Sequence, residues 1–342
     1  MKKILVLGAG AMGSAFTVPC IDNKNNVTLV GTHIEDEIIS KITSKNNLHP
    51  GLKCHLDQSL KIEKFENLSK IFKQKPDLIV VGVSSKGIDW AGNEIAKYYI
   101  ESTPILLLTK GLTLIDNQIK TLSVKLKKIL SKKGLKKINI SVVKGPCLAQ
   151  GLANKIRTSV VIANENISIA KTIGKIISTN YYSIEYSKDV VGVEVCAAIK
   201  NIYSMLIGAA EGLSSSTANI DVKRKNYLNT AASLLKKSIS EMVYLTTYFK
   251  GKEKTVYGLA GLGDLYVSAL GGRNSKMGKY LGDGLAYNKA KKDFMSNDTI
   301  EAGELVLEIG PKILKEFDKN KIPLMTNLIE SICHNKKLDI NW

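Results

Sequence analysis

A lysine interrupts an otherwise apolar run in the second half of the chain. The segment VVGVEVCAAIKNIYSMLIGAA (190–210) has no proline and is dominated by small and apolar residues, with Lys200 and Asn201 near its middle. This pattern predicts a mostly buried helix. Burying an unpaired ammonium group is costly, so Lys200 either reaches the surface or faces a polar site. In such a site, burial and cationic neighbours would lower its pKa and suit it to acid–base chemistry near neutral pH.

Glycine-rich segments that follow this run carry further candidate residues. In YGLAGLGDLYVSALGGRNSKMGKYLGDG (257–284), glycines precede Asp264, and a second glycine pair precedes Arg273 and Asn274. A later segment, NDTIEAGE, contains Glu301. Glycine lets the backbone approach a ligand closely, and an arginine there can bind a phosphate through two hydrogen bonds. The segments therefore indicate either ordinary loops or a site for a phosphorylated ligand.

The N-terminal segment KKILVLGAGAMGSAF (2–16) contains a GxGxxG motif between an apolar run and a stretch of helix formers. Strand, tight turn and helix in this order are typical of a dinucleotide site, because the helix N-terminus offers N–H groups to a pyrophosphate. The motif predicts NAD or NADP as the cofactor. The residues expected to bind it are Gly8, Gly10, Ala11, Met12 and Gly13.

Further apolar runs predict the sheet to which this first strand belongs. Most are continuous Val, Ile and Leu runs, as in parallel strands buried on both faces. They cover residues 26–32, 76–85, 103–111, 138–146 and 157–165. Ligands bind at the carboxyl ends of such strands, where the sequence has Ser84, Lys110, Gly145 and Cys147. Lys110 is either a ligand-binding cation or an ordinary surface lysine.

The end of the second predicted strand bears on the choice between NAD and NADP. An acidic residue there bonds the ribose hydroxyls, whereas a basic residue accepts the 2′-phosphate. In VGTHIED, Thr32 and His33 occupy this place, and Glu35 and Asp36 follow. We expect Thr32 and His33 to contact the cofactor, but the sequence leaves the choice between NAD and NADP open.

The strand pattern stops near residue 189, and the remainder is mostly helical. The predicted fold is an α/β N-terminal Rossmann domain with a doubly wound, mostly parallel sheet, residues 1–188, followed by an all-α C-terminal domain, residues 189–342. A chain of 342 residues, of which 44% are hydrophobic, can form two cores at roughly 100–200 residues per domain.

Composition argues against several other classes of protein. The formal net charge is +18, but the lysines are spread along the chain, and KLKKILSKKGLKK (125–137) has the pattern of an amphipathic helix with a solvated face. We therefore expect no specific nucleic-acid partner. The five scattered cysteines and four histidines show neither a disulfide framework nor metal-ligand spacing, which favours a cytoplasmic protein without a metal. No apolar run approaches the roughly 20 residues of a membrane span.

In combination, these motifs resemble those of the soluble bacterial type of NAD(P)-dependent glycerol-3-phosphate dehydrogenase. The resemblance spans nearly the whole chain, and the IKN, GLGDL and GRN segments are its most specific part. The matching segments, in order, are GAGAMG (8–13), TKG (109–111), GP (145–146), Lys200-Asn201, GLAGLGDL (258–265), GRN (272–274) and TIE (299–301).

The resemblance implies roles for these residues. Lys200 would be the catalytic base, Asp264 would orient it and the substrate, and Lys110 would complete the catalytic set. The implied substrate-binding residues are Lys110, Gly145, Cys147, Lys200, Asn201, Asp264, Arg273 and Asn274, with Arg273 and Asn274 holding the phosphate. Implied cofactor contacts, beyond the glycine motif, are Thr32, His33, Ser84, Lys110, Ala149, Arg273 and Glu301.

The implied reaction is the reduction of dihydroxyacetone phosphate to sn-glycerol 3-phosphate by a cytoplasmic homodimer, which would supply phospholipid synthesis. Some residues depart from the common pattern of the family, so the identity of the substrate follows less directly than the reaction type. These residues are Cys147, Gly151, Ala231, Gly272 and Ala302.

Three other functions are compatible with parts of the sequence. A related dehydrogenase would act on another phosphorylated ketone or a 3-hydroxy acid; its lysine usually has an asparagine one helical turn later, where this chain has Ser204. A non-catalytic dinucleotide sensor would be expected to lack Lys200, Asp264 or Arg273, all of which are present. A nucleic-acid-binding protein is suggested by charge alone and predicts salt-sensitive binding.

Overall fold

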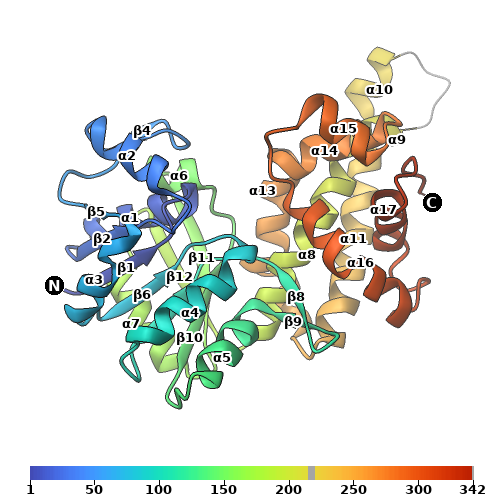
Figure 1. The fold of residues 1–342 in the computed structure, drawn as a ribbon. Coiled ribbons are helices and arrows are strands. Elements are labelled where there is room, and N and C mark those ends of the chain that lie inside the picture. The colour runs from blue at the N-terminus through green and yellow to red at the C-terminus, as the bar shows by residue number, and fades with distance from the viewer. Residues whose placement is uncertain (215–219, 341–342) are drawn as a thin grey trace. The chain divides into compact units, whose positions relative to one another are not determined.

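The computed structural model describes residues 1–214 and 220–340 and divides the chain into two compact units (Figure 1). The first unit consists of Met1–Lys110 and Thr121–Val190, and the second of Gly111–Lys120 and Val191–Trp342. The short segment Gly111–Lys120 thus belongs to the unit that contains the C-terminal helices. The hydrophobic pattern of the sequence gives no sign of this grouping.

The first unit is built on an eight-stranded sheet with the order β12-β11-β10-β7-β6-β1-β2-β5. Neighbouring strands pair in parallel except at the β10–β11 junction, which is antiparallel. The predicted doubly wound, mostly parallel sheet is therefore confirmed. The strands are β1 (Lys3–Leu7), β2 (Asn26–Val30), β5 (Lys61–Glu63), β6 (Leu78–Val81), β7 (Pro104–Leu107), β10 (Asn139–Lys144), β11 (Thr158–Ala163) and β12 (Tyr182–Ser187), with a separate small pair β3 (Leu48–His49) and β4 (Cys54–His55).

Helices connect these strands. Helix α1 packs on β1 and β2 and also contacts α6 and α7, whereas α4 packs on α5, and α5 contacts β10. The helices of this unit are α1 (Ala11–Asp22), α2 (Asp36–Ser44), α3 (Leu68–Lys73), α4 (Ile88–Tyr98), α5 (Leu122–Lys132), α6 (Ala149–Ala153) and α7 (Ile167–Ile177). Helix α5 covers most of the lysine-rich segment for which the sequence predicts an amphipathic helix.

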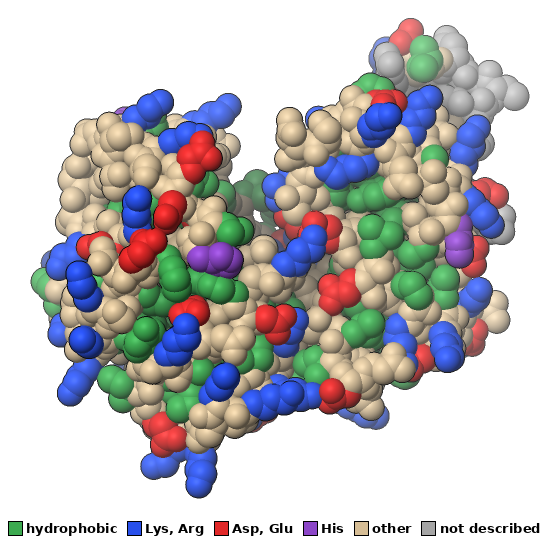
Figure 2. Space-filling view, in the orientation of Figure 1, with side chains coloured by type: hydrophobic (Ala, Val, Ile, Leu, Met, Phe, Trp, Pro, Cys, Tyr) green, Lys and Arg blue, Asp and Glu red, His purple; other side chains and the backbone are tan. Residues whose placement is uncertain are grey.

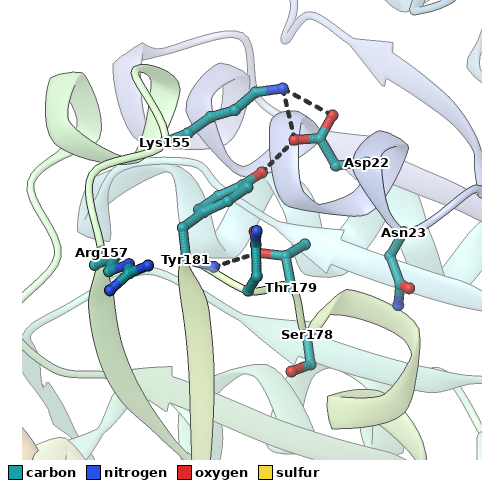
Figure 3. A pocket seen from close by; sticks show the side chains of 8 residues that line it. Asp22, Asn23, Lys155, Arg157, Ser178, Thr179 and Tyr181 are labelled. Carbon is teal, nitrogen blue, oxygen red and sulfur yellow. Dashed lines mark hydrogen bonds and ion pairs between the residues drawn. The ribbon is translucent and has the colours of Figure 1, made fainter.

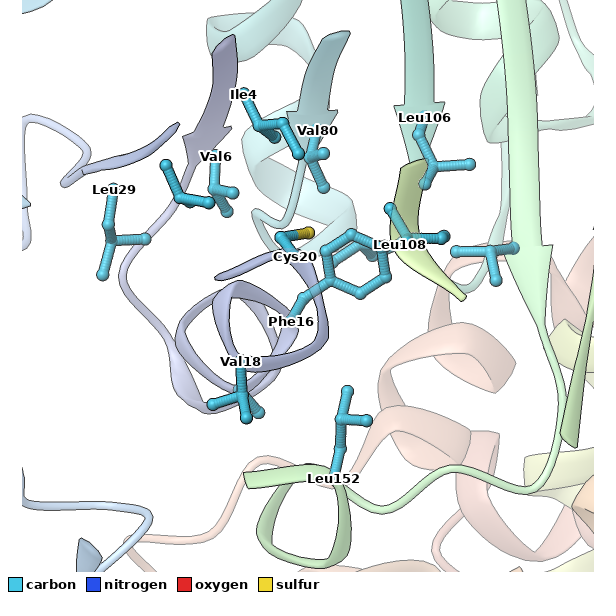
Figure 4. Packing of buried hydrophobic residues seen from close by; sticks show 14 of the residues in the cluster. Ile4, Val6, Phe16, Val18, Cys20, Leu29, Val80, Leu106, Leu108 and Leu152 are labelled. Atoms are coloured by element: carbon cyan, nitrogen blue, oxygen red, sulfur yellow. The ribbon is translucent and has the colours of Figure 1, made fainter. Parts of the chain in front are cut away.

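The core beneath α1 shows why β1 and the glycine turn are held firmly. Ile4 and Val6 of β1 point to the same face of the sheet, because side chains alternate along a strand, and both pack near Phe16 of α1 (Figure 4). The ring of Phe16 meets that of Tyr182 edge-on at a centroid distance of 6.2 Å. Leu5 is also fully buried and alternates to the opposite face, so the strand is covered on both sides, as expected for a parallel sheet between helices.

In the residues that the structure describes, the second unit consists of helices and one β-hairpin. Its helices are α8 (Val190–Gly208), α9 (Ala210–Leu213), α10 (Ile220–Asn226), α11 (Leu228–Tyr248), α12 (Glu253–Val256), α13 (Asp264–Leu270), α14 (Arg273–Gly282), α15 (Tyr287–Phe294), α16 (Glu301–Glu316) and α17 (Pro323–Cys333). The hairpin consists of β8 (Leu112–Ile115) and β9 (Gln118–Thr121). Its β8 strand contacts α16, and the Thr113 hydroxyl donates to Glu308 Oε1 at 2.6 Å. The hairpin is therefore anchored to the helical unit.

Helix α8 is the buried helix expected around Lys200. It is 19 residues long, and by length and composition alone it could cross a membrane. This differs from the expectation that no apolar run of the sequence approaches such a length. However, 89% of its apolar window is buried inside the protein. It is therefore the central helix of the second unit, apolar on all sides because all sides are packed.

Lysine and arginine side chains are interspersed with apolar and acidic ones over the surface that Figure 2 shows. On this face they do not merge into one basic stripe. The amphipathic helix α5 accounts for a large local share of the charge, with Leu122, Leu126 and Leu130 buried beneath its lysines. This pattern is typical of solvated helix faces rather than of a nucleic-acid-binding surface.

Candidate active site

Lys200 ends in a polar cluster inside the second unit. Its ammonium group donates to Asp264 Oδ1 at 2.8 Å and to the hydroxyl of Ser268. The side chains of Lys200 and Asp264 are only 5% and 4% exposed. The charge in the middle of the apolar helix is thus compensated by a buried carboxylate, because an unpaired ammonium group in this place would be strongly disfavoured.

Helix α13 places both partners of Lys200. Asp264 is its first residue and Ser268 lies four residues later, so both side chains lie on one helix face. A single π-helical turn, Leu259–Gly263, leads into α13. A Cβ atom on Gly261 would lie 2.1 Å from the carbonyl oxygen of Val256, so only glycine lets this turn pack closely. The glycine-rich segment 257–284, for which the sequence indicates loops or a ligand site, is therefore mostly helical, and Gly261 serves helix packing here.

Arg273, Asn274 and Glu301 form a second polar group in this unit. Arg273 and Asn274 are the first residues of α14, and Glu301 is the first residue of α16. Arg273 pairs with Glu301, and both side chains are about half exposed, at 49% and 45%. Asn274 is buried; its amide donates to Glu301 Oε2 at 3.3 Å, and its Oδ1 accepts from the backbone N–H of Ala302 at 3.0 Å. Asn274 thus joins the N-terminal ends of α14 and α16, while Arg273 remains accessible to an anion.

Asn201 follows Lys200 in α8 and is likewise buried. The structure thus contains, within the second unit, a Lys–Asp–Ser cluster whose lysine and aspartate are buried, and an Arg–Asn–Glu cluster. The first holds a proton-carrying group among hydrogen-bonding partners. The second presents a guanidinium group that can bind an oxyanion bidentately.

The first unit contains the glycine turn at the start of α1. A Cβ atom on Gly13 would lie 2.1 Å from the carbonyl oxygen of Gly8, so glycine is required for α1 to begin this close to β1. A Cβ atom on Gly10 would instead have open space, with only Glu35 Oε1 nearby at 3.8 Å. The turn therefore combines tight packing on its inner side with an open approach at Gly10, and a pyrophosphate needs both features.

The remaining sequence-predicted residues of this unit lie at the carboxyl ends of neighbouring strands. Strands β10, β7, β6, β1 and β2 are adjacent and parallel, so their carboxyl ends meet there. The residues that follow these ends are Gly145 after β10, Lys110 after β7, Ser84 after β6, the glycine turn after β1, and Thr32 with His33 after β2. Cys147 donates its N–H to Gly145 O at 2.8 Å, and Ala149 begins α6. The ring of His33 lies 5.1 Å from that of Trp90.

The structure also shows polar side chains near the candidate site residues that the sequence does not single out. Ser268 bonds Lys200, and its spacing of four residues from Asp264 is a signal that could have found it. Lys144, buried at the end of β10, donates to the carbonyl oxygens of residues 107, 108 and 109 at 3.1, 3.2 and 2.8 Å. It supports the strand end that leads to Lys110. Glu35 and His49 both bond Ala9 of the glycine turn.

One open cavity of the first unit, of about 610 Å³, does not include any of these residues (Figure 3). Three of its side chains bond one another, since Asp22 accepts from both Lys155 and the Tyr181 hydroxyl, at 2.8 and 2.6 Å. The cavity is therefore separate from the candidate site residues.

Comparisons with known proteins agree with this arrangement. The family model described as the N-terminus of NAD-dependent glycerol-3-phosphate dehydrogenase matches residues 3–170, and the model of its C-terminus matches residues 189–340. The chain is 32% identical over 290 residues to the NADP(+)-dependent glycerol-3-phosphate dehydrogenase of Archaeoglobus fulgidus, covering 85% of this chain and 83% of that protein. It is 27% identical over 316 residues to a glycerol-3-phosphate dehydrogenase [NAD(P)+] of Clostridium botulinum, covering 92% of this chain and 89% of that protein.

Solved structures show the same fold. A glycerol-3-phosphate dehydrogenase from Coxiella burnetii aligns with a TM-score of 0.79 at 23% identity, covering 98% of this chain and 96% of that chain. The yeast enzyme, at 18% identity, aligns with a TM-score of 0.80, covering 98% and 97%. Since the family models cover both units and a relative above 30% identity spans most of the chain, this protein belongs to the NAD-dependent glycerol-3-phosphate dehydrogenase family.

Proposed function

We propose that this protein catalyses the NAD(P)H-dependent reduction of dihydroxyacetone phosphate to sn-glycerol 3-phosphate, and the reverse oxidation. Membership of the family supports this reaction over the alternative of a dehydrogenase for another phosphorylated ketone or a 3-hydroxy acid. The observation that carries the proposal is the buried ion pair between Lys200 and Asp264. A charged pair of this kind in the central helix has no packing purpose, since apolar residues of similar size are often at least as stabilising.

The proposed proton chemistry centres on Lys200. In the reduction, its ammonium group donates a proton to the carbonyl oxygen as that oxygen gains negative charge; in the oxidation, the amine accepts the hydroxyl proton. Asp264 and Ser268 hold the nitrogen in place through the two hydrogen bonds described above. When bound, the reduced nicotinamide cofactor supplies the hydride.

Other residues are assigned to substrate binding. Arg273 and Asn274 bind the phosphate, with Arg273 providing the charge and the bidentate geometry. Asn201 bonds a polar group of the substrate. For the first unit, we propose that Lys110 contributes to catalysis and binding, and that Gly145 and Cys147 line the substrate site.

Cofactor binding is assigned mainly to the first unit. The open approach at Gly10 and the N-terminus of α1, which no side chain caps, fit a pyrophosphate. The pyrophosphate would rest on the glycine motif, at Gly8, Gly10, Ala11, Met12 and Gly13. Further cofactor contacts are proposed for Thr32, His33, Ser84, Lys110, Ala149, Arg273 and Glu301.

We also propose the wider setting of the enzyme. Residues 1–188 act as the cofactor-binding domain and residues 189–342 as the substrate domain. The protein works as a cytoplasmic homodimer and supplies glycerol phosphate for phospholipid synthesis. The spread of its lysines over solvated helix faces argues against a dedicated nucleic-acid partner.

The test is an assay of the purified protein with dihydroxyacetone phosphate and either reduced cofactor. The decisive readouts are loss of the absorbance of the reduced nicotinamide and formation of sn-glycerol 3-phosphate. Unphosphorylated dihydroxyacetone serves as the matched control substrate. Cofactor binding without turnover would reject this substrate and direct attention to the altered residues Cys147 and Gly151, using a panel of phosphorylated ketones and 3-hydroxy acids.

A further inference from the structure

The carboxylate of Glu35 joins the glycine turn to the end of β2. Its Oε2 atom accepts two backbone hydrogen bonds, one from Ala9 N at 2.9 Å and one from Thr32 N at 2.8 Å. Ala9 lies between the first two glycines of the motif, and Thr32 follows the second strand. The acidic group therefore lies at the junction where a dinucleotide fold binds the adenosine ribose.

A tight turn brings Glu35 back to this place. Its own N–H bonds Thr32 O at 3.0 Å, and its carbonyl oxygen accepts from Ile39 N at 2.9 Å as α2 begins. The sequence alone does not show this contact, because Glu35 lies five residues beyond Val30, the last residue of β2. The turn folds the chain back, so that the side chain of Glu35 lies next to Thr32, just after the end of β2.

Ala9 is fixed from its other side by a buried histidine. His49 is 1% exposed, and its Nδ1 accepts from the N–H groups of Gly51 and Leu52, both at 3.1 Å. Nε2 therefore carries the proton and donates to Ala9 O at 3.1 Å. Both polar groups of the Ala9 peptide are thus bonded, so the carboxylate of Glu35 is attached to a rigid part of the turn.

The second carboxylate oxygen of Glu35 faces the cofactor side. Oε1 is the nearest atom to the position that a Cβ of Gly10 would take, at 3.8 Å, and this approach is otherwise open. Since Oε2 already receives both backbone N–H groups, Oε1 is the oxygen placed to accept a hydrogen bond from a ligand hydroxyl. A ribose diol has the donors for such a bond, whereas a phosphate monoester at neutral pH offers mainly acceptors.

The segment that carries Glu35 is also acidic. Glu35, Asp36 and Glu37 are consecutive, with Asp36 and Glu37 in the first turn of α2. The nearby cation Lys41 pairs with Glu37 at 2.6 Å. A 2′-phosphate placed here would therefore meet carboxylates rather than the arginine or lysine that commonly accepts it.

We infer that Glu35 accepts a hydrogen bond from the 2′-hydroxyl of the cofactor's adenosine ribose and thereby makes this enzyme prefer NADH to NADPH. The inference rests on the proposed function for the identity of the cofactor. It concerns binding and does not depend on which substrate is reduced. The discrimination comes from one gained hydrogen bond with NADH and from repulsion between two anions with NADPH.

The experiment measures equilibrium binding of NADH and NADPH by titration calorimetry, without substrate, at low and high salt. For the native chain, NADH binds roughly tenfold or more tightly than NADPH, since like charges at close range repel strongly. The test variant is Glu35→Gln, whose amide oxygen can still accept from Ala9 and Thr32 while the charge is removed. Glu37→Gln is the matched control, because it makes the same charge change on an exposed side chain two residues away.

We expect Glu35→Gln to shift the ratio of the NADPH and NADH dissociation constants by roughly tenfold toward NADPH, and Glu37→Gln to shift it much less. Equal affinities in the native chain, equal shifts in both variants, or failure of both nucleotides to bind would overturn the inference. Nucleotide binding with the expected preference, but without turnover of dihydroxyacetone phosphate, would leave the inference standing and reject the proposed reaction. A thermal-unfolding scan of each variant verifies that the turn is intact.

Discussion

The ammonium nitrogen of Lys200 lies 2.8 Å from Oδ1 of Asp264, and neither side chain is more than 5% exposed. The two residues come from α8 and α13, so their encounter is a product of the tertiary fold. Each charge is acceptable in the interior because the other is present. This mutual dependence determines what substitutions should do to activity and to stability.

Replacement of Lys200 by methionine should remove turnover and leave the cofactor site in place. The side chain keeps a similar length and loses the proton donor, and general acid–base catalysis contributes roughly 10²- to 10⁴-fold to a rate. We expect kcat to fall by at least about 10²-fold, with little change in the dissociation constant of NADH. Steady-state kinetics and calorimetry measure the two quantities.

Lys289→Met is the matched control for this substitution, because Lys289 is an exposed lysine of the same unit. Its kcat should equal that of the native chain. A Lys200→Met variant that retains most of its turnover would show that another group transfers the proton. Circular dichroism is needed alongside, since the unpaired Asp264 is expected to weaken the fold.

Stability should respond to the pair as a unit. Removing either partner alone, in Lys200→Met or Asp264→Asn, is expected to lower the free energy of unfolding by roughly 3–5 kcal/mol, because a buried charge is left without its partner. The double variant should lose clearly less than the sum of the two single losses. Urea unfolding of the four proteins gives this double-mutant cycle, and strictly additive losses would contradict the coupling.

Much of the first unit could be predicted from its sequence because its signals are local. The apolar run, the glycines and the helix formers of residues 2–16 are adjacent in the chain, and strands buried on both faces have a continuous apolar pattern. The strand β5 is too short to show a pattern of its own. Strand β12 alternates apolar with exposed residues and lies at the sheet edge, so the pattern of buried strands does not reveal it.

The features of the fold and of the site that could not be predicted from the sequence depend on non-local contacts. Glu35 reaches Ala9 only through a turn that reverses the chain direction, and no hydrophobic period marks that turn. The β8–β9 hairpin joins the helical unit through contacts with α16, which lies almost two hundred residues away in sequence. Lys144 looks like any other lysine in the sequence, and only the fold shows that three carbonyl groups surround its ammonium group.

Substitution of Arg273 by alanine should act on the phosphate of the substrate. A guanidinium group binds a phosphate bidentately, so its loss is expected to raise the Michaelis constant for dihydroxyacetone phosphate by roughly tenfold or more. Turnover of unphosphorylated dihydroxyacetone, where measurable, should change little. The Michaelis constant of Arg273→Lys for dihydroxyacetone phosphate should lie between those of the native chain and Arg273→Ala, because lysine keeps the charge without the fork geometry. Equal losses on both substrates would assign Arg273 to another role, such as its pairing with Glu301.

A different buried acid makes the stability of the second unit depend on pH. Glu241 of α11 is 4% exposed; its two carboxylate oxygens accept from Leu324 N at 2.7 Å and Met325 N at 3.0 Å, at the start of α17, and also from the Tyr203 hydroxyl at 3.0 Å. Burial raises the pKa of Glu241 from 4.5 to about 7, although these hydrogen bonds and the charge of Lys237 act in the opposite direction. The folded chain therefore binds this proton more tightly than the unfolded chain does.

The sign of the effect follows from that difference. The contribution of Glu241 to the free energy of unfolding is fully present below pH 4.5 and is lost as the pH rises through about 7, for a total of roughly 3 kcal/mol. Glu241→Gln cannot titrate, so its stability should vary less between these pH values than that of the native chain. Urea unfolding across this range measures both slopes, with the exposed Glu253→Gln as the matched control. If native and Glu241→Gln proteins showed the same slope, the proton on Glu241 would not contribute, and another group would have to account for the pH dependence.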